Sequence, residues 1–435
     1  MYFLKKRIFR GSLRRMSSNA ALLARANACL PSLTHLASCR PEGCPTFFAS
    51  GSGCRVTDAD GREWLDYMCS YGPVLLGHRH PAVEAAIAAQ RLRGDCLSGP
   101  TERMVELGEL LVATIPWASW SFFAKNGGDA TELAVRMARA QTGRRVVLRA
   151  PQSYHGASPL WREGSDAALA VEGVEPSASA SLRPYAFNDL RSVVAAADEA
   201  FEHGGVAAII VAAFKWDWGV RHEAATAEFL RGVRRLCDER GAALICDDVR
   251  SSFRVNAGGT WEDERYGHGV RPDLSCLSKG MANGQPLSAV VGSHKWRKGA
   301  EAVRATGTFW ANAVPFAAAL ATIPLAPAAA ERAEAAGTAL RDGLRAQARA
   351  AGLGEDFGQS GPPQMPLFHF DSEGEKPPAQ RRKIVAFCRR AAEGGVLLHP
   401  FHTMFIGGAH SLEDVEQTLS VTQLAFEAVV NLDPQ

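Results

Sequence analysis

The sequence predicts an α/β fold in which a mostly parallel sheet is covered by helices on both faces. From about residue 115 onward, short apolar segments alternate with longer segments whose apolar residues recur every three or four positions. The short segments are apolar throughout, which is typical of parallel strands that are buried on both faces. A chain of 435 residues with 46% hydrophobic and 22% charged residues can bury more than one core.

Each predicted element follows from its own pattern. Apolar runs predict strands at 121–124, 145–149, 206–212, 242–246, 274–277 and 287–291. Two segments carry apolar residues on one helical face and predict helices at 129–140 and 223–240. After residue 320 the chain becomes rich in Ala, Arg and Glu, with short apolar segments at 365–370 and 396–398.

These patterns predict four parts of the chain. They are a basic N-terminal extension (1–21), the N-terminal part of a small domain (22–75), a large ligand-binding domain (76–317) and a C-terminal α+β part of the small domain (318–435).

Charge is unevenly distributed, since residues 1–41 contain eight Lys and Arg and no Asp or Glu. The first 21 residues have the composition of a mitochondrial or plastid transit peptide, although a disordered tail or an upstream start before Met16 would look the same. We therefore expect an organellar location if the segment is a transit peptide, and a cytoplasmic one otherwise. Residues 42–435 carry 40 basic and 46 acidic side chains, a formal net charge of −6, which argues against nucleic-acid binding.

Neither a membrane span nor a structural metal site is expected. The most apolar run, 314–330, contains Pro315, Pro324 and Pro327. The ten cysteines include no C-x-x-C pair, so they suit a reducing compartment rather than a zinc site or a disulfide framework. His399, His402 and His410 cluster in sequence, but a loop running into a helix capped by Ser411 explains the last of them better than a metal does.

Four features stand at predicted strand ends. Asn126-Gly127-Gly128 precedes a helix, where backbone amides and the helix dipole favour an anion, although such a turn is often only structural. Tyr154, followed by His155, can stack on a planar ligand or can belong to the core rim. Asp247 follows a buried strand and could ligate a metal, cap a helix or pair with a protonated ring nitrogen. Lys279 follows another buried strand, where desolvation lowers the pKa of an amine, or is a solvated loop residue.

Together the four features match the requirements of pyridoxal 5′-phosphate (PLP). This cofactor needs a phosphate site, a ring clamp, an acid at its pyridine nitrogen and a lysine for its aldehyde. Because ligands of parallel sheets bind beyond the carboxyl ends of the strands, one edge of the sheet can supply all four.

At this point the sequence resembles the class III aminotransferases of fold type I, near their glutamate-1-semialdehyde aminomutase branch. The resemblance runs from about Asn19 to Glu427 and rests on motifs in the family's order, at 56–61, 71–73, 76–81, 100–102, 125–131, 154–156, 247–254, 272–279 and 306–308. It implies a mostly parallel seven-stranded sheet, PLP as cofactor, and a homodimer.

The resemblance also implies residue roles. Lys279 matches the lysine of the Schiff base, Asp247 the acid at the pyridine nitrogen, and Tyr154 and Val249 the residues on the two ring faces. Asn126, Gly127 and Gly128, with His155 nearby, match the cofactor-binding turn. Thr308 matches a threonine that reaches the phosphate of the neighbouring subunit, which implies active sites shared across the dimer.

Several departures leave the substrate open. Gly128 lacks the family's hydroxyl, and Ala212-Ala213 stands where many relatives have Glu-Pro. Trp216, within the stretch 215–218, could line a pocket for an apolar or extended substrate or could cover the cofactor, and His402 could border the site. Arg250 and Arg254 are candidates for reading a substrate carboxylate, or are partners in structural ion pairs.

The predicted activity is transfer of an amino group from an amine or amino acid to a carbonyl acceptor through Lys279. An intramolecular aminomutase is the alternative within the fold, and a catalytically silent relative is the alternative outside it. We expect small-molecule partners, a homodimer, and neither nucleic acid nor a membrane.

Overall fold

The computed structural model describes residues 18–33, 43–151, 153–162, 173–216, 221–371 and 377–432. The predicted extension lies outside these ranges up to residue 17, as do Asp217 and Trp218 of the aromatic stretch. The helices are α1 (Asn19–Asn27), α2 (Pro81–Arg93), α3 (Glu102–Thr114), α4 (Gly127–Thr142), α5 (Pro159–Arg162), α6 (Leu190–Phe201), α7 (Ala227–Arg240), α8 (Glu264–Gly267), α9 (Arg297–Ala302), α10 (Ala313–Thr322), α11 (Ala326–Ala350), α12 (Pro377–Glu393) and α13 (Leu412–Val430).

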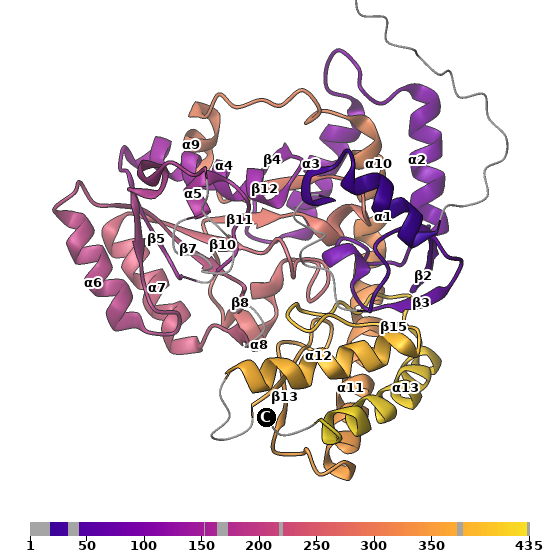
Figure 1. The fold of residues 1–435 in the computed structure, drawn as a ribbon. Helices are drawn as coiled ribbons and strands as arrows, with labels where there is room; N and C mark the ends of the chain where they lie inside the picture. Colours follow the sequence, from indigo (N-terminus) through magenta and orange to yellow (C-terminus); the bar gives the residue numbers. More distant parts are fainter. Residues whose placement is uncertain are drawn as a thin grey trace, which may run out of the picture.

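A seven-stranded sheet organises the larger part of the molecule (Figure 1). Its spatial order is β4 (Trp120–Ala124), β12 (Ser288–Gly292), β11 (Leu274–Leu277), β10 (Ala243–Asp247), β7 (Val206–Ala212), β5 (Val146–Arg149) and β6 (Leu182–Pro184). Only β12 runs antiparallel to its neighbours, and the other adjacent pairs are parallel. The predicted mostly parallel, seven-stranded α/β fold is therefore confirmed.

Two sequence predictions differ from the structure in detail. The edge strand β6 was not predicted, because three residues ending in a proline carry too little pattern to be recognised. The helix predicted at 223–240 begins only at Ala227, since the Thr226 hydroxyl caps it by accepting a hydrogen bond from the amide of Phe229 at 3.3 Å. Residues 222–224 instead form β9 (His222–Ala224), which pairs with β8 (Phe214–Trp216).

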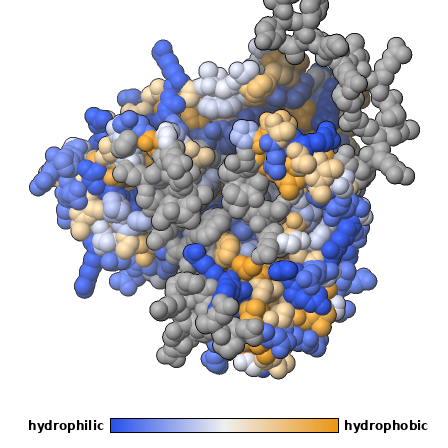
Figure 2. All heavy atoms as spheres, in the orientation of Figure 1, coloured by the Kyte–Doolittle hydropathy of each residue, from blue (hydrophilic) through white to orange (hydrophobic). Residues whose placement is uncertain are grey.

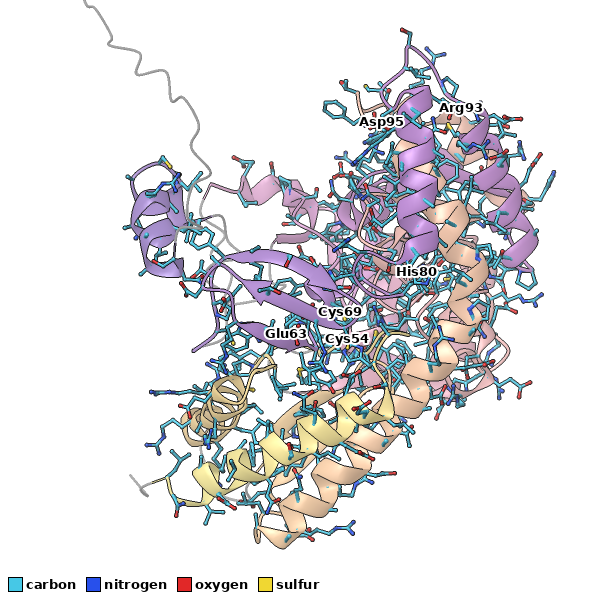
Figure 3. The ribbon with its side chains drawn as sticks, turned by 90° about the vertical axis from the view of Figure 1, so that its right-hand side faces the viewer. Cys54, Glu63, Cys69, His80, Arg93 and Asp95 are labelled. Atoms are coloured by element: carbon cyan, nitrogen blue, oxygen red, sulfur yellow. The ribbon has the colours of Figure 1, made fainter. Side chains whose placement is uncertain are left out.

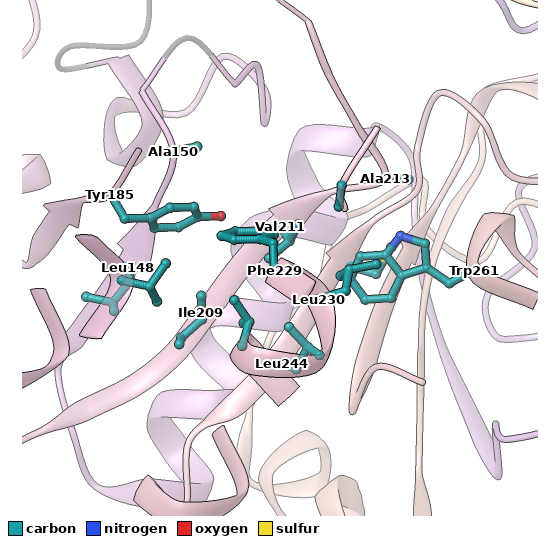
Figure 4. Packing of buried hydrophobic residues seen from close by; sticks show 14 of the residues in the cluster. Leu148, Ala150, Tyr185, Ile209, Val211, Ala213, Phe229, Leu230, Leu244 and Trp261 are labelled. Carbon is teal, nitrogen blue, oxygen red and sulfur yellow. The ribbon is translucent and has the colours of Figure 1, made fainter. Parts of the chain in front are cut away.

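Helices cover both faces of the sheet because successive side chains of each strand point in opposite directions. On β7, Ala208 and Ile210 belong to the core under α4, whereas Ile209 and Val211 belong to the core under α6 and α7. Figure 4 shows the second of these cores, with Phe229 of α7 beside Val211. The α4 core fixes the position of a helix whose first residues prove to be functional.

A smaller sheet joins the two ends of the chain. Its order is β1 (Phe48–Ser52), β2 (Arg55–Asp58), β3 (Glu63–Asp66) and β15 (Val396–Leu397), with β15 parallel to β3. The helices α11, α12 and α13 gather beside it, in orange and yellow in Figure 1, together with the hairpin of β13 (Phe357–Ser360) and β14 (Leu367–Phe370). The predicted pairing of N-terminal with C-terminal segments agrees with this sheet, while the domain boundaries at 75/76 and 317/318 stay a prediction.

The helix α1 begins inside the predicted extension and is tied to the body by Asn19. The Asn19 amide and side chain donate to the Asp60 carboxylate, both at 3.0 Å, and its carbonyl oxygen accepts from the amides of Thr46 and Phe47. Asn19 therefore ties the start of α1 to Asp60 and to the segment 46–47.

Three helices pack together at one end of the sheet. Helix α10 lies against α2 and α3, and Figure 3 shows α2 rising from His80 to Arg93, with Asp95 beyond its end. The segment Ala313–Ala350, which contains α10 and α11, is long and apolar enough to cross a membrane by length and composition, but 67% of its most apolar window is buried in the fold. A 3₁₀ turn, Ile323–Leu325, separates α10 from α11 within this segment. Pro324 in that turn and Pro327 in α11 occupy first-turn positions, where no amide donor is needed. On the face shown in Figure 2, charged and apolar side chains are interspersed.

Candidate active site

A pocket of about 540 Å³ lies where β4, β5, β7, β10 and β11 end. These strands all present their carboxyl ends to the same edge of the sheet, where ligands of α/β folds bind. The predicted site residues that line the pocket are Asn126, Gly127, Gly128, Tyr154, His155, Trp216, Asp247, Val249, Arg250 and Lys279. The fold thus brings together residues that are up to 153 positions apart in the sequence.

Lys279 stands two residues after β11, at the first position of a 3₁₀ turn, Lys279–Ala282. Its Nζ donates a hydrogen bond to the carbonyl oxygen of Tyr71 at 2.9 Å. Burial, and then the positive charge of Arg250, lower the pKa of Lys279 to about 7. A substantial fraction of the side chain is therefore an uncharged nucleophile near neutral pH, as Schiff-base formation requires.

Asp247 ends β10 and is held in place by two donors. Its Oδ2 lies 2.6 Å from Nδ1 of His155, and its Oδ1 accepts a hydrogen bond from the amide of Val249 at 3.2 Å. His155 is buried and packs on Trp161 with ring centroids 5.1 Å apart, and its Nε2 has no hydrogen-bond partner among the described residues. His155 thus orients the Asp247 carboxylate at the base of the pocket.

The N-terminus of α4 forms a close-packed cradle with the loop after β5. A Cβ atom on Gly127 would lie 2.5 Å from Cγ1 of Val249, and one on Gly128 would lie 3.2 Å from Cα of Gly156. The Thr131 hydroxyl fastens the two segments by donating to the carbonyl of His155 at 2.6 Å. Space explains why residue 128 is a glycine here and carries no hydroxyl, so the backbone amides at the helix N-terminus are the donors left for an anion.

Asn126 and Tyr154 flank this cradle. The Asn126 side chain donates to Oδ2 of Asp129 at 3.2 Å, and the Asn126 amide donates to the same oxygen at 2.9 Å, so this asparagine stabilises the first turn of α4. Tyr154 is 46% exposed and lines the pocket, which leaves its ring free to cover a flat ligand.

One wall of the pocket is apolar. Ala212 ends β7, and Phe214 and Trp216 follow it on β8, while Met365 closes the wall from a distant segment. The guanidinium of Arg250 lies over the Trp216 ring, 4.7 Å from its centroid. At the end of β7, Ala212 presents a methyl group to the pocket.

Three predicted residues do not line the pocket. Arg254 is fully buried and donates to the backbone carbonyls of Ile406, Gly72 and Val74. His402 is also buried, with its ring 4.8 Å from that of Trp216, and burial lowers its pKa well below the ordinary value, so that it is neutral. Thr308 is exposed and has no contact with the pocket of its own chain.

The other two histidines of the C-terminal cluster have structural partners. Nδ1 of His399 accepts a hydrogen bond from the amide of Phe401 at 3.0 Å, and Nδ1 of His410 lies 3.1 Å from the amide of Gly407. Among the residues that the structure describes, no three His, Cys, Asp or Glu side chains come together as metal ligands would.

Residues that sequence reasoning did not assign complete the pocket. The Tyr71 carbonyl that receives Lys279 belongs to a segment whose residues Cys69, Ser70 and Tyr71 all have positive φ angles, from 44° to 64°. Such strain in three successive non-glycine residues is typical of functional sites, but it cannot be read from side-chain pattern. Met365 begins the apolar segment 365–370, and nothing in the sequence indicates that it faces the pocket.

The residues present fit PLP. The crowded glycines form a cradle suited to a phosphate, the Lys279 amine is reactive near neutral pH, and Asp247 supplies a fixed negative charge for a pyridinium. When bound, the cofactor supplies the aldehyde and the electron sink for chemistry at an amine carbon.

Comparisons with known proteins agree with this geometry. The family model described as "Aminotransferase class-III" matches residues 39–413. An aminopentol aminotransferase of Sphingopyxis macrogoltabida is 41% identical over 394 residues, which covers 90% of this chain and 88% of that protein. A glutamate-1-semialdehyde 2,1-aminomutase of Chloroflexus aurantiacus is 32% identical, with 89% and 91% covered.

Comparison with solved structures indicates the same family. The PLP form of the FumI protein of Sphingopyxis sp. MTA144 superposes with a TM-score of 0.88 at 40% identity, covering 96% of this chain and 98% of that one. With the fold, the cradle, the lysine and the aspartate in place, this chain belongs to the class III aminotransferases and is a PLP-dependent enzyme.

Proposed function

We propose that the enzyme transfers the amino group of an extended, largely uncharged amine to a separate carbonyl acceptor, with Lys279 as the cofactor lysine. The observation that carries this proposal is the apolar wall of Ala212, Phe214, Trp216 and Met365. A wall without a carboxylate does not bind a second ammonium or guanidinium group, and it gains from covering a hydrocarbon chain.

The comparison with the aminopentol aminotransferase supports an amine of this kind. Its name makes an aminopentol, an amine that carries hydroxyl groups, the donor of that enzyme. Hydroxyl groups on an amine suit a pocket that combines an apolar wall with the serines 153, 158 and 251. The aminomutase relatives favour a second candidate, in which one substrate both gives and receives the amino group.

In the proposed reaction two side chains act directly. The neutral amine of Lys279 would accept the proton that leaves the amine-bearing carbon of the substrate, a role that suits a base whose pKa lies near the working pH. The Asp247 carboxylate, oriented by His155, stabilises the positive charge on the ring nitrogen. Tyr154 covers the open side of the pocket.

A donor screen tests the proposal. The holoenzyme is mixed with single amines, and conversion of the cofactor is followed by its absorbance before any acceptor is added. Long-chain amines and amino alcohols should convert it faster than glutamate or ornithine. Conversion by dicarboxylic or diamino donors alone would contradict the proposal, and turnover of one substrate without any acceptor would establish the aminomutase instead.

Asp247→Asn is the control for cofactor-dependent chemistry. Because it removes the charge but keeps the shape, turnover should fall about 100-fold or more while the cofactor still binds. Turnover near that of the wild type would mean that another acid serves the ring nitrogen.

We further propose that the enzyme is a homodimer in which Thr308 completes the partner's site. Thr308 is exposed and is followed by Phe309, which is 61% exposed. Leu92 and Leu97 are 91% and 50% exposed, and they flank Asp95. The Asp95 carboxylate accepts a hydrogen bond from the amide of Val314 at 2.8 Å, so the segments 92–97 and 308–309 both lie at the base of α10. A second copy of the chain would cover these apolar side chains.

Mixing two inactive variants tests the shared site. Chains carrying Lys279→Ala are combined with chains carrying Thr308→Trp, so that each heterodimer has one site with both defects and one with neither. About half of the wild-type activity per heterodimer should return. If labelled subunits exchange and no activity returns, Thr308 does not serve the partner.

A further inference from the structure

We propose that Asp66 is a positioning residue for the reaction, because its carboxylate fixes the backbone turn whose Tyr71 carbonyl orients the amine of Lys279. This inference rests on the proposed function in one respect, since it takes Lys279 as the cofactor lysine. Asp66 is not among the described residues that line the pocket, so it acts on the amine through the backbone between residues 66 and 71.

Both ends of the hydrogen bond between Lys279 and Tyr71 lie in strained backbone. Tyr71 has a φ of +64° and Lys279 a φ of +42°, a region that residues with side chains seldom adopt. The bond joins Nζ of Lys279 to the carbonyl oxygen of Tyr71 at 2.9 Å. Strain of this kind persists only where the surrounding structure imposes it. The shape of the turn at 69–71 must therefore be held by its neighbours.

The Asp66 carboxylate holds the turn from its N-terminal side. Asp66 ends β3 and is buried. Its Oδ1 accepts hydrogen bonds from the amide of Met68 at 2.9 Å and from the amide of Cys69 at 3.0 Å, just before the chain reaches Tyr71. Its Oδ2 lies 2.9 Å from Nε2 of His78, which fixes the second oxygen. A buried carboxylate with these three partners cannot rotate freely, so it gives the two amides a fixed point.

The guanidinium of Arg254 holds the other side of the turn. It donates to the carbonyls of residues 72 and 74 at 2.8 Å and 3.2 Å. The Tyr71 carbonyl lies between the two anchors, so its position depends on both. Asp66 is the anchor that can be tested by itself, because Arg254 also places a positive charge near Lys279.

The Tyr71 carbonyl gives the amine a direction. A neutral amine has two N–H groups and one lone pair, and the lone pair is what attacks an aldehyde carbon. Lys279 belongs to the described residues that line the pocket and Tyr71 does not, so an N–H donated to Tyr71 leaves the lone pair on the pocket side. Condensation joins Nζ to the aldehyde carbon, and both amine protons leave with the aldehyde oxygen as one water. Without the carbonyl the amine adopts more rotamers, and fewer of them can attack.

Two ligands separate the orientation of the amine from the rest of the site. Pyridoxamine 5′-phosphate fits the same pocket but has no aldehyde, so its dissociation constant from cofactor-free protein reports the cradle and Asp247. PLP has the aldehyde, and at saturating PLP the first-order rate constant of condensation reports the amine. This rate constant is followed by absorbance at about pH 9, where Lys279 is uncharged.

Asp58 provides a matched control in the same small sheet. It ends β2, is buried, and accepts from the amides of residues 60 and 62, each at 2.9 Å, and from Nε1 of Trp64 at 3.0 Å. Like Asp66, it is a buried carboxylate with two amide partners and one ring nitrogen. None of the contacts described for its turn reaches Lys279.

In Asp66→Ala the rate constant of condensation should fall about 3- to 10-fold, as expected for one lost hydrogen bond, while pyridoxamine 5′-phosphate binds within about twofold of the wild type. Asp66→Asn should recover part of the rate, because its amide oxygen can still accept from Met68 and Cys69. Asp58→Ala and Asp58→Asn should change neither quantity. If Asp66→Ala does not fold, the rate constant of Asp66→Asn is compared with that of Asp58→Asn and should be the lower of the two.

Three results would overturn the inference. The first is a wild-type rate constant in Asp66→Ala, or in Asp66→Asn where the alanine variant does not fold. The second is an equal loss of rate and of pyridoxamine 5′-phosphate affinity, which would leave Asp66 a structural role only. The third is the same loss of rate in the Asp58 variants. The proposed function fails separately, if Lys279→Ala still condenses with PLP in the pocket.

Discussion

Replacement of Gly156 by alanine should separate the cofactor cradle from the rest of the fold. Gly156 has a φ of +123°, and a Cβ atom there would lie 2.5 Å from Cα of Gly128, against an ordinary carbon contact of about 3.5–4.0 Å. The segment must therefore move by about 1 Å or more, and it would move the first turn of α4 away from the anion. Backbone strain of about 1–2 kcal/mol and overpacking of about 1–3 kcal/mol add to a loss of about 2–5 kcal/mol in the free energy of unfolding.

Gly143→Ala is the matched control on the same helix. Gly143 ends α4 with a φ of +71°, and a Cβ atom there would meet nothing within 4 Å. It therefore carries the backbone strain of about 1–2 kcal/mol without the clash. The free energy of unfolding of each cofactor-free variant is measured in urea.

The dissociation constant for PLP is the decisive measurement. Loss of one hydrogen bond to the phosphate would weaken binding about 10- to 150-fold in Gly156→Ala, whereas Gly143→Ala should bind as the wild type does. A Gly156→Ala protein that binds PLP with wild-type affinity would refute the assignment of this turn as the phosphate cradle.

Three further predictions concern the lysine, the buried arginine and the N-terminus. In cofactor-free protein, the rate of condensation of Lys279 with PLP should rise between about pH 6 and 8 and then level off, because its pKa is about 7; a rate still rising at pH 9 would mean an ordinary amine. In the unfolded chain the lysine pKa is about 10.4, so between about pH 7 and pH 10 the unfolded state binds more protons than the folded state. The free energy of unfolding of the cofactor-free protein should therefore rise from about pH 7 to pH 10. Arg254→Met should lower the free energy of unfolding by at least about 3 kcal/mol in urea titrations, because three carbonyls lose a charged donor, and an unchanged stability would contradict its structural role. A protein that starts at Met16 should keep full activity, whereas further removal through Asn19 should lower the melting temperature by cutting its ties to Asp60; equal melting temperatures would show that this anchor contributes nothing.

The main functional residues could be predicted because they stand at strand ends. A strand buried on both faces is apolar throughout, so the polar residue that follows it is conspicuous, and parallel strands bring such residues to one edge. Asp247 and Lys279 were recognised in this way, and the structure places both in one pocket. Boundaries were less predictable, as the start of α7 shows, because capping by Thr226 and strand pairing at 222–224 both compete with the helical pattern.

The sequence by itself therefore determined the α/β class, the four features that indicate PLP and the order of the family motifs. Only the tertiary structure distinguished Arg250 from Arg254. Both arginines follow β10, and the sequence pattern does not distinguish them. The turn between them is set by the buried Asp248 carboxylate, which accepts from the Ser251 hydroxyl at 2.6 Å and the Thr260 amide at 2.7 Å. These bonds join residues that are up to 12 positions apart, and they direct one arginine into the pocket and the other into the core. No local pattern encodes that choice, because the direction of a side chain in an irregular loop depends on its distant hydrogen-bond partners.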